Sequence, residues 1–433
     1  MFSYNNHFDK LFKFNTLRID LKLFFASHEF RTDSTLLRYF QKFETFYWGV
    51  IVLILEIMNS INRFIFWVLG TWLVKSCPEY PNPTFYLDSS LFTNALEEVD
   101  AFILNVTTTN NVPGFITSIV LDQTLLFVKG YGSSDYFAKN APPPNGDNLV
   151  QIASITKVFT DVLLYYYRDA QMLNLDDPVT RYAPQFKIRS PYHSNRPITL
   201  RELSSHNSGL PREVPYPCSW TQECTAAEVF ELVSKEYVVM PQNERFHYSN
   251  LGIAVLGYAL SRVNEMQQMT YEQVMEEIII RGLNLSQYTG FNYSDPNVIA
   301  QSAVGVTTNP LNQSELIPVR LHSIGFENPA GGMLASANDL AKLMQFMFRN
   351  NITVNEHPNQ LLDGFTVNEM LTPQMLLNDG LGAIGSPWEM AYNYFNSTSN
   401  GYIYVYVYSC KQEAPYFFGE KILVGKKRAT PFF

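Results

Sequence analysis

Apolar residues recur at helical spacing in two parts of the chain, each time directly after a polar segment. After residue 154 the recurring apolar positions are Ile155, Val158, Phe159, Val162, Leu163 and Tyr166. After residue 250 they are Leu251, Val255, Leu256, Tyr258, Ala259 and Val263. Side chains three and four residues apart lie on one face of a helix, so each run predicts a helix that packs an apolar face on a core.

Nearly continuous apolar residues near the N-terminus form a different pattern. Residues 46–55 and 64–74 are mostly apolar, and a polar stretch that contains Arg63 separates them. A membrane-spanning helix needs about 20 mostly apolar residues, so neither run is long enough alone. Residues 58–63, 64–74 and 75–77 have the order of a basic region, an apolar region and a processing site.

The segment 46–76 therefore predicts delivery of the following domain out of the cytosol. Translation from Met58 would make this segment a secretory signal, whereas translation from Met1 would make it an uncleaved membrane anchor. A helix of a soluble domain is the alternative. We thus expect a secreted protein, or a membrane-anchored one whose domain is extracellular or lumenal.

The first predicted helix begins with a serine and a lysine that can meet. Ser154 precedes Lys157 by three residues, and a helix presents positions i and i+3 on one face. A lysine whose burial leaves its amine neutral can take the proton of a hydroxyl, as in the Ser-x-x-Lys arrangement of serine acylases. A serine N-cap followed by a solvated lysine is the alternative.

The second predicted helix begins after a Tyr-x-Asn sequence. Tyr248 and Asn250 lie two residues apart in an extended turn, so their side chains point the same way. A phenol can relay protons, and a carboxamide can anchor an amide of a substrate. A tyrosine packed at a helix entrance is the alternative for Tyr248.

Three further segments stand in a recognisable order with these two elements. They are residues 173–179 (LNLDDPV), 198–211 (ITLRELSSHNSGLP) and 329–341 (PAGGMLASANDLA). Together the five segments closely resemble the β-lactamase-related family, which includes class C β-lactamases, low-molecular-weight penicillin-binding proteins and esterases. The resemblance covers about residues 90–395 and is closest to the eukaryotic β-lactamase-like 1 subgroup.

This resemblance implies an α/β fold of the β-lactamase/transpeptidase type. A mainly antiparallel sheet would carry a helical region inserted between about residues 157 and 328. Residues 90–104 are expected to form an N-terminal helix, and residues 115–121 and 125–130 a hairpin with a tight turn between them. The active site would lie between the sheet and the helical region, where the serine helix begins.

The resemblance also implies a role for each residue of the two motifs. Ser154 would be the nucleophile and Lys157 its activating partner. Tyr248 would carry the proton to the leaving group, and Asn250 would orient the substrate. Mechanistically, these roles describe a serine hydrolase that forms an acyl-enzyme on an amide, ester or peptide.

Two neighbouring segments are expected to be structural. His206 belongs to a turn in this family, which favours a loop histidine with satisfied hydrogen bonds over a catalytic base. Gly331 and Gly332 are expected to allow a tight backbone turn beside the site.

The chain departs from the family at its third catalytic element. Family members carry a basic-x-Gly sequence on a strand that faces the serine, where it supplies a positive charge and one N–H of the oxyanion hole. No Lys-x-Gly, Arg-x-Gly or His-x-Gly occurs in the 433 residues. The strand-like residues 402–408 are followed by Lys411-Gln412-Glu413, and the closing strands and terminal helix are expected to be missing. A truncated or spliced product and a gene model carried into an intron both explain this pattern.

Composition and length fit one catalytic domain with a leader. We expect an unassigned segment at 1–45, a signal or anchor at 46–76, the β-lactamase-related domain at 85–408 and an atypical tail at 409–433. The net charge of −9 argues against a partner that is a nucleic acid. The sequence has no phosphate-binding loop and no metal-ligand spacing, so we expect no cofactor and no metal.

Cysteine spacing agrees with an oxidising compartment. Cys218 and Cys224 bracket a short loop, which predicts a local disulfide. Sequons for N-glycosylation begin at Asn105, Asn284, Asn292, Asn312, Asn351 and Asn396. They allow glycosylation but do not show that it occurs.

Two functions from different classes fit the sequence. The first is a serine hydrolase acting on a small-molecule or peptide substrate, impaired by the missing third motif. The second is a non-catalytic relative that is tethered to a membrane or assembles with itself. Ser154, Lys157, Tyr248 and Asn250 favour the first, whereas the missing basic-x-Gly favours the second.

Overall fold

The computed structural model describes residues 90–192, 196–218, 223–263, 269–349, 351–377, 382–392 and 404–405. The expected leader at 46–76 and tail at 409–433 lie outside these ranges. Within them, no helix combines the length and the apolar composition that crossing a bilayer requires.

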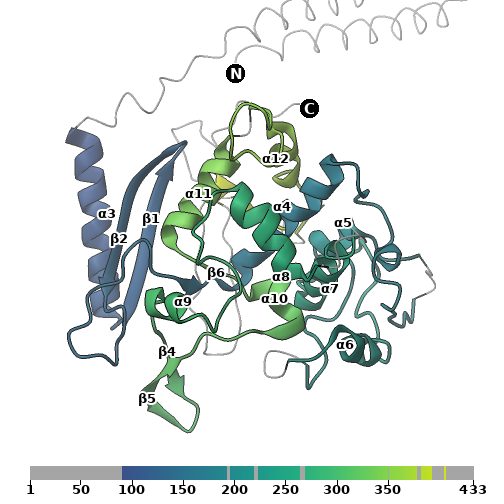
Figure 1. The fold of residues 1–433 in the computed structure, drawn as a ribbon, viewed down its shortest axis with the longest axis horizontal. Helices are drawn as coiled ribbons and strands as arrows, with labels where there is room; N and C mark the ends of the chain where they lie inside the picture. The colour runs from purple at the N-terminus through teal and green to yellow at the C-terminus, as the bar shows by residue number, and fades with distance from the viewer. Residues whose placement is uncertain are drawn as a thin grey trace, which may run out of the picture. The chain divides into compact units, whose positions relative to one another are not determined.

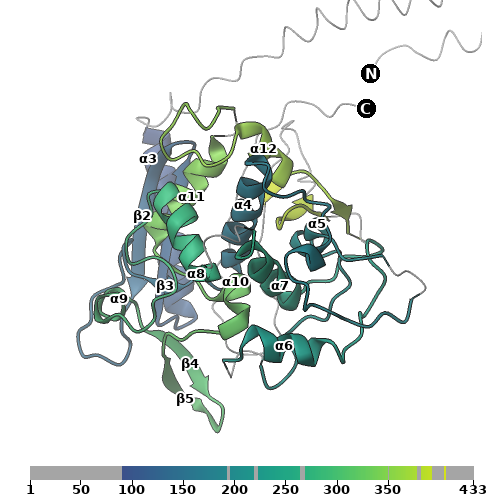
Figure 2. The same cartoon turned by 45° about the vertical axis from the view of Figure 1, so that its right-hand side comes forward.

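A helix and a β-hairpin form one side of the domain. Helix α3 (Ser90–Thr109) lies along β2 (Thr124–Gly132), which pairs antiparallel with β1 (Gly114–Leu121) (Figures 1 and 2). Lys129 and Tyr131 of β2 both donate hydrogen bonds to Asp100 of α3, at 2.7 and 2.6 Å. The sequence predicted this helix and hairpin correctly, although the helix runs five residues beyond residue 104.

The remaining described strands form three small sheets, and every pairing among them is antiparallel. Within the described residues, β1 and β2 pair only with each other. A four-stranded sheet has the order β10-β9-β8-β7. The strands are β3 (Val150–Gln151), β4 (Gly305–Asn309), β5 (Asn312–Val319), β6 (Leu334–Ala335), β7 (Met375–Leu376), β8 (Gly382–Ile384), β9 (Glu389–Tyr392) and β10 (Tyr404–Val405).

Helices fill the region between β3 and β6, as predicted. Several begin with a side-chain cap, and Thr199 and Thr225 each form a capping box with the glutamate three residues on. The helices are α4 (Thr156–Asp169), α5 (Leu200–Ser204), α6 (Ala226–Val233), α7 (Asn250–Leu260), α8 (Tyr271–Val274), the π-helix η5 (Met275–Ile280), α9 (Pro296–Gln301) and α10 (Asn328–Gly331), with α11 (Ala337–Phe348) and α12 (Gly364–Met370) after β6; the short 3₁₀ turns are η3 (Ala153–Ile155), η4 (Val179–Arg181) and η6 (Gly325–Glu327).

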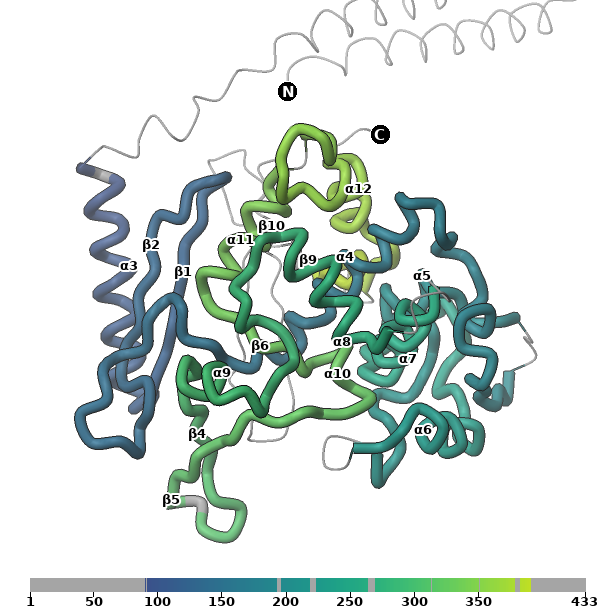
Figure 3. The backbone as a smooth tube through the Cα atoms, in the orientation of Figure 1, coloured from purple at the N-terminus to yellow at the C-terminus, as the bar shows by residue number. Residues whose placement is uncertain are grey.

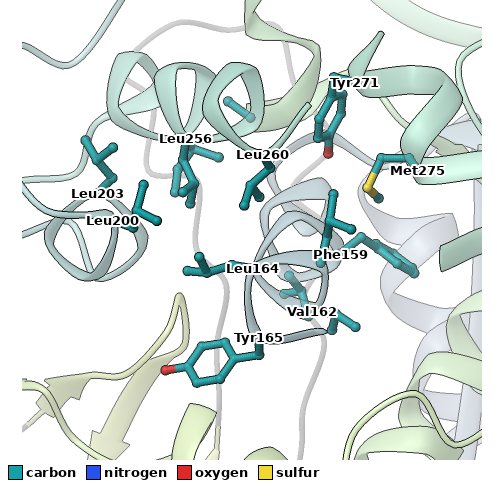
Figure 4. Packing of buried hydrophobic residues seen from close by; sticks show 14 of the residues in the cluster. Phe159, Val162, Leu164, Tyr165, Leu200, Leu203, Leu256, Leu260, Tyr271 and Met275 are labelled. Carbon is teal, nitrogen blue, oxygen red and sulfur yellow. The ribbon is translucent and has the colours of Figure 1, made fainter. Parts of the chain in front are cut away.

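Helix α4 lies at the centre of the hydrophobic core. Phe159, Val162 and Leu164 of α4 are fully buried, and they face side chains of α5, α7, α8 and η5 (Figure 4). Burial of each such side chain contributes about 1.5–3 kcal/mol. The periodicity predicted one apolar face, but α4 is buried on nearly all sides because helices surround it. This burial extends to the polar residues at its start.

Helix α10 packs against both α4 and α7 (Figure 3). Gly257 of α7 allows this contact, because a Cβ there would lie 2.3 Å from the Pro329 ring. The start of α4 is therefore enclosed by α7 and α10.

A disulfide closes a loop between α5 and α6. It joins Cys218 to Cys224, whose Cα atoms are 5.4 Å apart. By the chain-entropy relation, so short a loop contributes about 2 kcal/mol at most.

Candidate active site

Ser154 lies in a constrained turn between β3 and α4. Strand β3 pairs with β6, and the Ile152 N–H donates to the Met333 carbonyl at 2.9 Å. Ala153 then has a φ of +46°, a left-handed conformation that costs about 1 kcal/mol in a residue with a Cβ. The turn places Ser154 just before the N-terminus of α4, where the helix dipole favours negative charge.

Ser154, Lys157 and Tyr248 meet at one point. The Lys157 amine donates to Ser154 Oγ at 3.0 Å and also to the Ala330 carbonyl of α10. The Tyr248 hydroxyl donates to the same Ser154 Oγ at 2.7 Å. Lys157 has no exposed surface and Ser154 is only 6% exposed. The alternative of a solvated lysine is therefore wrong.

Behind Lys157 lies a buried acid that the sequence did not reveal. Asp161 follows Lys157 by one helical turn and is fully buried. The Ser204 hydroxyl donates to Asp161, and the hydroxyls of Ser204 and Ser386 are 2.7 Å apart. Burial raises the pKa of the Asp161 carboxyl well above its usual value, although the Ser204 hydrogen bond and the Lys157 charge act in the opposite direction.

The raised pKa of Asp161 bears directly on the chemistry of Lys157. An anion one turn away would hold the proton on the lysine amine, whereas a neutral acid would not. Burial of Asp161 therefore acts in the direction that lets the amine accept the serine proton. The spacing of four residues between Lys157 and Asp161 was visible in the sequence, but the burial that gives it meaning was not.

Asn250 is committed to a neighbouring carboxylate. Its Nδ2 donates to both oxygens of Glu213, at 3.0 and 2.8 Å, and Arg212 forms an ion pair with Glu213 at 3.1 Å. The Asn250 Oδ1 is buried and has no hydrogen-bond partner among the described residues.

Arg212 and Glu213 were missed by the sequence reasoning. They directly follow the segment 198–211 that carries part of the family resemblance. Arg212 also lies 4.9 Å from the centre of the Tyr248 ring, on a side chain that is 40% exposed. The pair brings a charged group to the rim of the site from a position that no spacing rule indicates.

The expected turn at Gly331 and Gly332 is a helix end. Gly331 is the last residue of α10, and Gly332 has a φ of −86°, which any residue can adopt. Gly332 is needed for space, because a Cβ there would lie 2.4 Å from Asn328 Oδ1 and 2.8 Å from the Tyr293 hydroxyl. The expected tight backbone turn is thus formed by the end of α10, and close packing explains the glycine at position 332.

Strand β9 brings a carboxyl group toward the same cations. Trp388 and Met390 are buried in the core, so the alternation of a strand turns Glu389 to the opposite face. Burial raises the pKa of Glu389 to about 7, while the charges of Lys157 and Arg212 act to lower it. Glu389 belongs to the last segment with the family pattern, but its proximity to these charges could not be read from the sequence.

The described residues contain no group of His, Cys, Asp and Glu side chains that could hold a metal ion. The site presents a serine hydroxyl with an amine and a phenol on the same oxygen. Such an arrangement can make the serine a nucleophile and move its proton onward.

A family model described as Beta-lactamase matches residues 95–413, and the chain belongs to this family. Its members include serine hydrolases, and the fold is that of the β-lactamases and penicillin-binding proteins.

Several curated proteins are similar to this chain. Beta-lactamase-like protein 2 of Dictyostelium discoideum is 36% identical over 79% of the chain and 61% of its own length. The human protein named Putative beta-lactamase-like 1 is 26% identical over 72% of the chain and 61% of its own length. The chain thus spans about three fifths of the length of the curated relatives that it matches.

Solved structures of low identity share the fold. An octameric penicillin-binding protein homologue from Pyrococcus abyssi superimposes with a TM-score of 0.58 at 21% identity, covering 72% of this chain and 70% of the other. A class C beta lactamase from Rhodobacter sphaeroides gives 0.53 at 20% identity, covering 66% and 73%. These likenesses support the predicted α/β fold.

We predict that Glu389→Gln stabilises the protein at neutral and alkaline pH. Because the folded pKa lies above the unfolded value, Glu389 makes folding less favourable as pH rises from about 4.5 to about 7, and the loss is constant above that. The free energy of unfolding of the variant should exceed that of the wild type by about 1–3 kcal/mol at pH 8 and equal it at pH 4.

Urea unfolding at both pH values measures this difference. Glu231→Gln is the matched control, because the Glu231 side chain is 73% exposed and its substitution should change stability by less than about 0.5 kcal/mol. A Glu389→Gln variant less stable than the wild type at pH 8 would show that the carboxylate is stabilised in the fold.

Proposed function

We propose that this chain is a serine hydrolase that forms an acyl-enzyme at Ser154 on an amide, ester or peptide substrate. One observation carries the proposal: a fully buried lysine amine and a tyrosine hydroxyl both bond the oxygen of one serine. A serine used only as a helix cap would need neither of these partners.

The proposed reaction has two halves. In the first, the Lys157 amine takes the proton of Ser154 while Oγ attacks the carbonyl carbon of the substrate. Tyr248 then passes a proton to the leaving group as its bond to carbon breaks. In the second half, water attacks the acyl-enzyme and loses its proton through the same groups, which restores the Ser154 hydroxyl.

In the proposed reaction, one of the two donors that stabilise the negative charge on the carbonyl oxygen is missing. The backbone N–H at Ser154 supplies one donor at the start of α4, and acyl transfer needs a second donor near the developing oxyanion. The sequence has no basic-x-Gly to supply it. We therefore propose that this polypeptide hydrolyses substrates slowly, by a factor of about 10²–10³ for one missing donor.

A second candidate function is a non-catalytic relative that tethers to a membrane or assembles with itself. The missing basic-x-Gly favours it, and the Pyrococcus abyssi homologue is described as octameric. Delivery out of the cytosol belongs to both proposals. The disulfide supports it, and so does the exposure of the sequon residues Asn105, Asn284, Asn292, Asn312 and Asn351.

We predict that covalent reaction with a fluorophosphonate or a fluorescent penicillin occurs at Ser154 and depends on Lys157. Ser154→Ala should abolish labelling, and Lys157→Met should slow it by about 10²-fold or more because the base is lost. Fluorescence of the protein band on a gel measures the reaction. Lys342→Met, at a lysine that pairs with Asp339 on α11, is the matched control and should label normally.

Labelling that persists in Ser154→Ala would remove Ser154 as the nucleophile. Circular dichroism should show that each variant stays folded, so that lost labelling reports lost chemistry.

The proposed impairment predicts a gain when the tail is repaired. Replacing residues 409–433 by a family-like basic-x-Gly strand, a closing strand and a helix should raise esterase turnover by about 10²-fold. Turnover of p-nitrophenyl esters by the two chains measures the effect. Equal turnover would refute the impairment and leave the nucleophile assignment untouched.

A further inference from the structure

The imidazole of His206 stacks against the phenol ring of Tyr248. The two ring centres are 4.4 Å apart and the planes differ by 25°. His206 is only 1% exposed, so solvent does not separate the rings. One face of the tyrosine that bonds Ser154 is thus covered by a second aromatic ring.

His206 is itself held rigidly by the segment that carries Tyr248. Its Nδ1 accepts a hydrogen bond from the Ser249 N–H at 3.1 Å, and its carbonyl accepts one from the His247 N–H at 3.0 Å. The Phe246 ring packs edge-on against it at 5.9 Å. His206 also has a φ of +57°, a conformation that the surrounding bonds must enforce.

Two cationic side chains also lie against the Tyr248 ring. Lys157 Nζ and the Arg212 guanidinium each lie 4.9 Å from the ring centre. Rotation about the Cβ–Cγ bond of a tyrosine has only a broad, two-fold preference, so the ring needs a rigid neighbour to fix its plane. The His206 ring, stacked 4.4 Å from the Tyr248 ring and held by the Ser249 N–H, is such a neighbour.

His206 stays neutral and does not bond the nucleophile. Burial lowers the pKa of His206 well below its usual value, and the charges of Lys157, Arg212 and His247 act in the same direction. Because Nδ1 accepts the Ser249 N–H, the proton of the ring is on Nε2, which has no acceptor among the described residues. The expected satisfied loop histidine is therefore satisfied at one nitrogen only.

We propose that His206 is a positioning residue that holds the Tyr248 phenol in line with Ser154 and the leaving group. The role rests on the proposed hydrolase function, in which Tyr248 passes a proton to the leaving group. A displacement of about 1 Å in such a group can cost about 10²-fold in rate. The cost falls on the step that needs the proton.

This dependence on the leaving group makes the role measurable. A p-nitrophenolate leaves without a proton, whereas an alkoxide must be protonated as it leaves. A misplaced Tyr248 should therefore slow acylation by an alkyl ester much more than acylation by the p-nitrophenyl ester of the same acid. The test compares kcat/KM for p-nitrophenyl butyrate and ethyl butyrate.

His206→Asn removes the imidazole ring but keeps the backbone conformation and an acceptor for the Ser249 N–H. Asparagine tolerates a positive φ, and its Oδ1 can accept the Ser249 N–H in place of Nδ1. We expect kcat/KM for ethyl butyrate to fall by about tenfold or more, with a much smaller fall for p-nitrophenyl butyrate. His206→Phe restores a ring, so the ratio of the two values should return toward that of the wild type.

His357→Asn is the matched control, because His357 Nδ1 also accepts a backbone N–H, from Asn359 at 3.1 Å, far along the chain from the site. Its ratio should equal that of the wild type. An unchanged ratio in His206→Asn, which means equal losses of kcat/KM for both esters, would overturn the proposal.

A second measurement separates this proposal from the proposed function. In protein with ¹³C-labelled tyrosine, Tyr248→Phe assigns the Tyr248 ring signals by NMR. In the wild type, these signals should show a ring-current shift from the His206 imidazole and slow flips of the Tyr248 ring. In His206→Asn, the ring-current shift should disappear and the ring flips should become fast. If the wild type hydrolyses neither ester and does not react with a fluorophosphonate, the proposed function is wrong. Ring signals that do not change in His206→Asn would by themselves overturn the positioning role.

Discussion

The enclosure of the Lys157 amine is the constraint from which the rest of the site follows. The amine lies between α4, α7 and α10, where it bonds one serine hydroxyl and one backbone carbonyl. A charged amine loses its hydration in such a place, so burial acts against the charged form. The nearest acid along the helix, Asp161, is buried too, and burial raises the pKa of its carboxyl. Packing of apolar helices thus creates the conditions for base chemistry.

Charges at the rim are arranged around Tyr248 and not around the nucleophile. Arg212 contacts the Tyr248 ring and pairs with Glu213, and Glu213 in turn holds the carboxamide of Asn250. The cation nearest the mouth therefore comes from the segment after α5, whereas in the family a basic residue comes from the facing strand. In this chain the described part of that side carries a carboxyl, Glu389.

Local signals in the sequence predicted the elements that are local in the fold. The hairpin, the start of α4 and the start of α7 each follow from periodicity with a turn or a cap, and motif order predicted the fold class. Ser154 and Lys157 meet because they are one helical turn apart. By contrast, burial and contacts with distant segments determine the roles of Asp161, Arg212 and Glu389. Periodicity does not show which face of a helix will be enclosed. It also does not show contacts between distant segments, so the close packing at Gly332 and the stacking of His206 on Tyr248 were not predicted.

The central claim is that Lys157 activates Ser154 by accepting its proton, and substitution by arginine tests it most directly. An arginine keeps a positive charge and hydrogen-bond donors at this position, but it does not give up its proton in a protein. The measurement is the rate of reaction of Ser154 with a fluorophosphonate as a function of pH, for the wild type and for a folded Lys157→Arg variant. The account predicts that the variant reacts about 10²-fold or more slowly than the wild type at every pH at which it remains folded. A variant that reacts at the wild-type rate with the same pH dependence would contradict it.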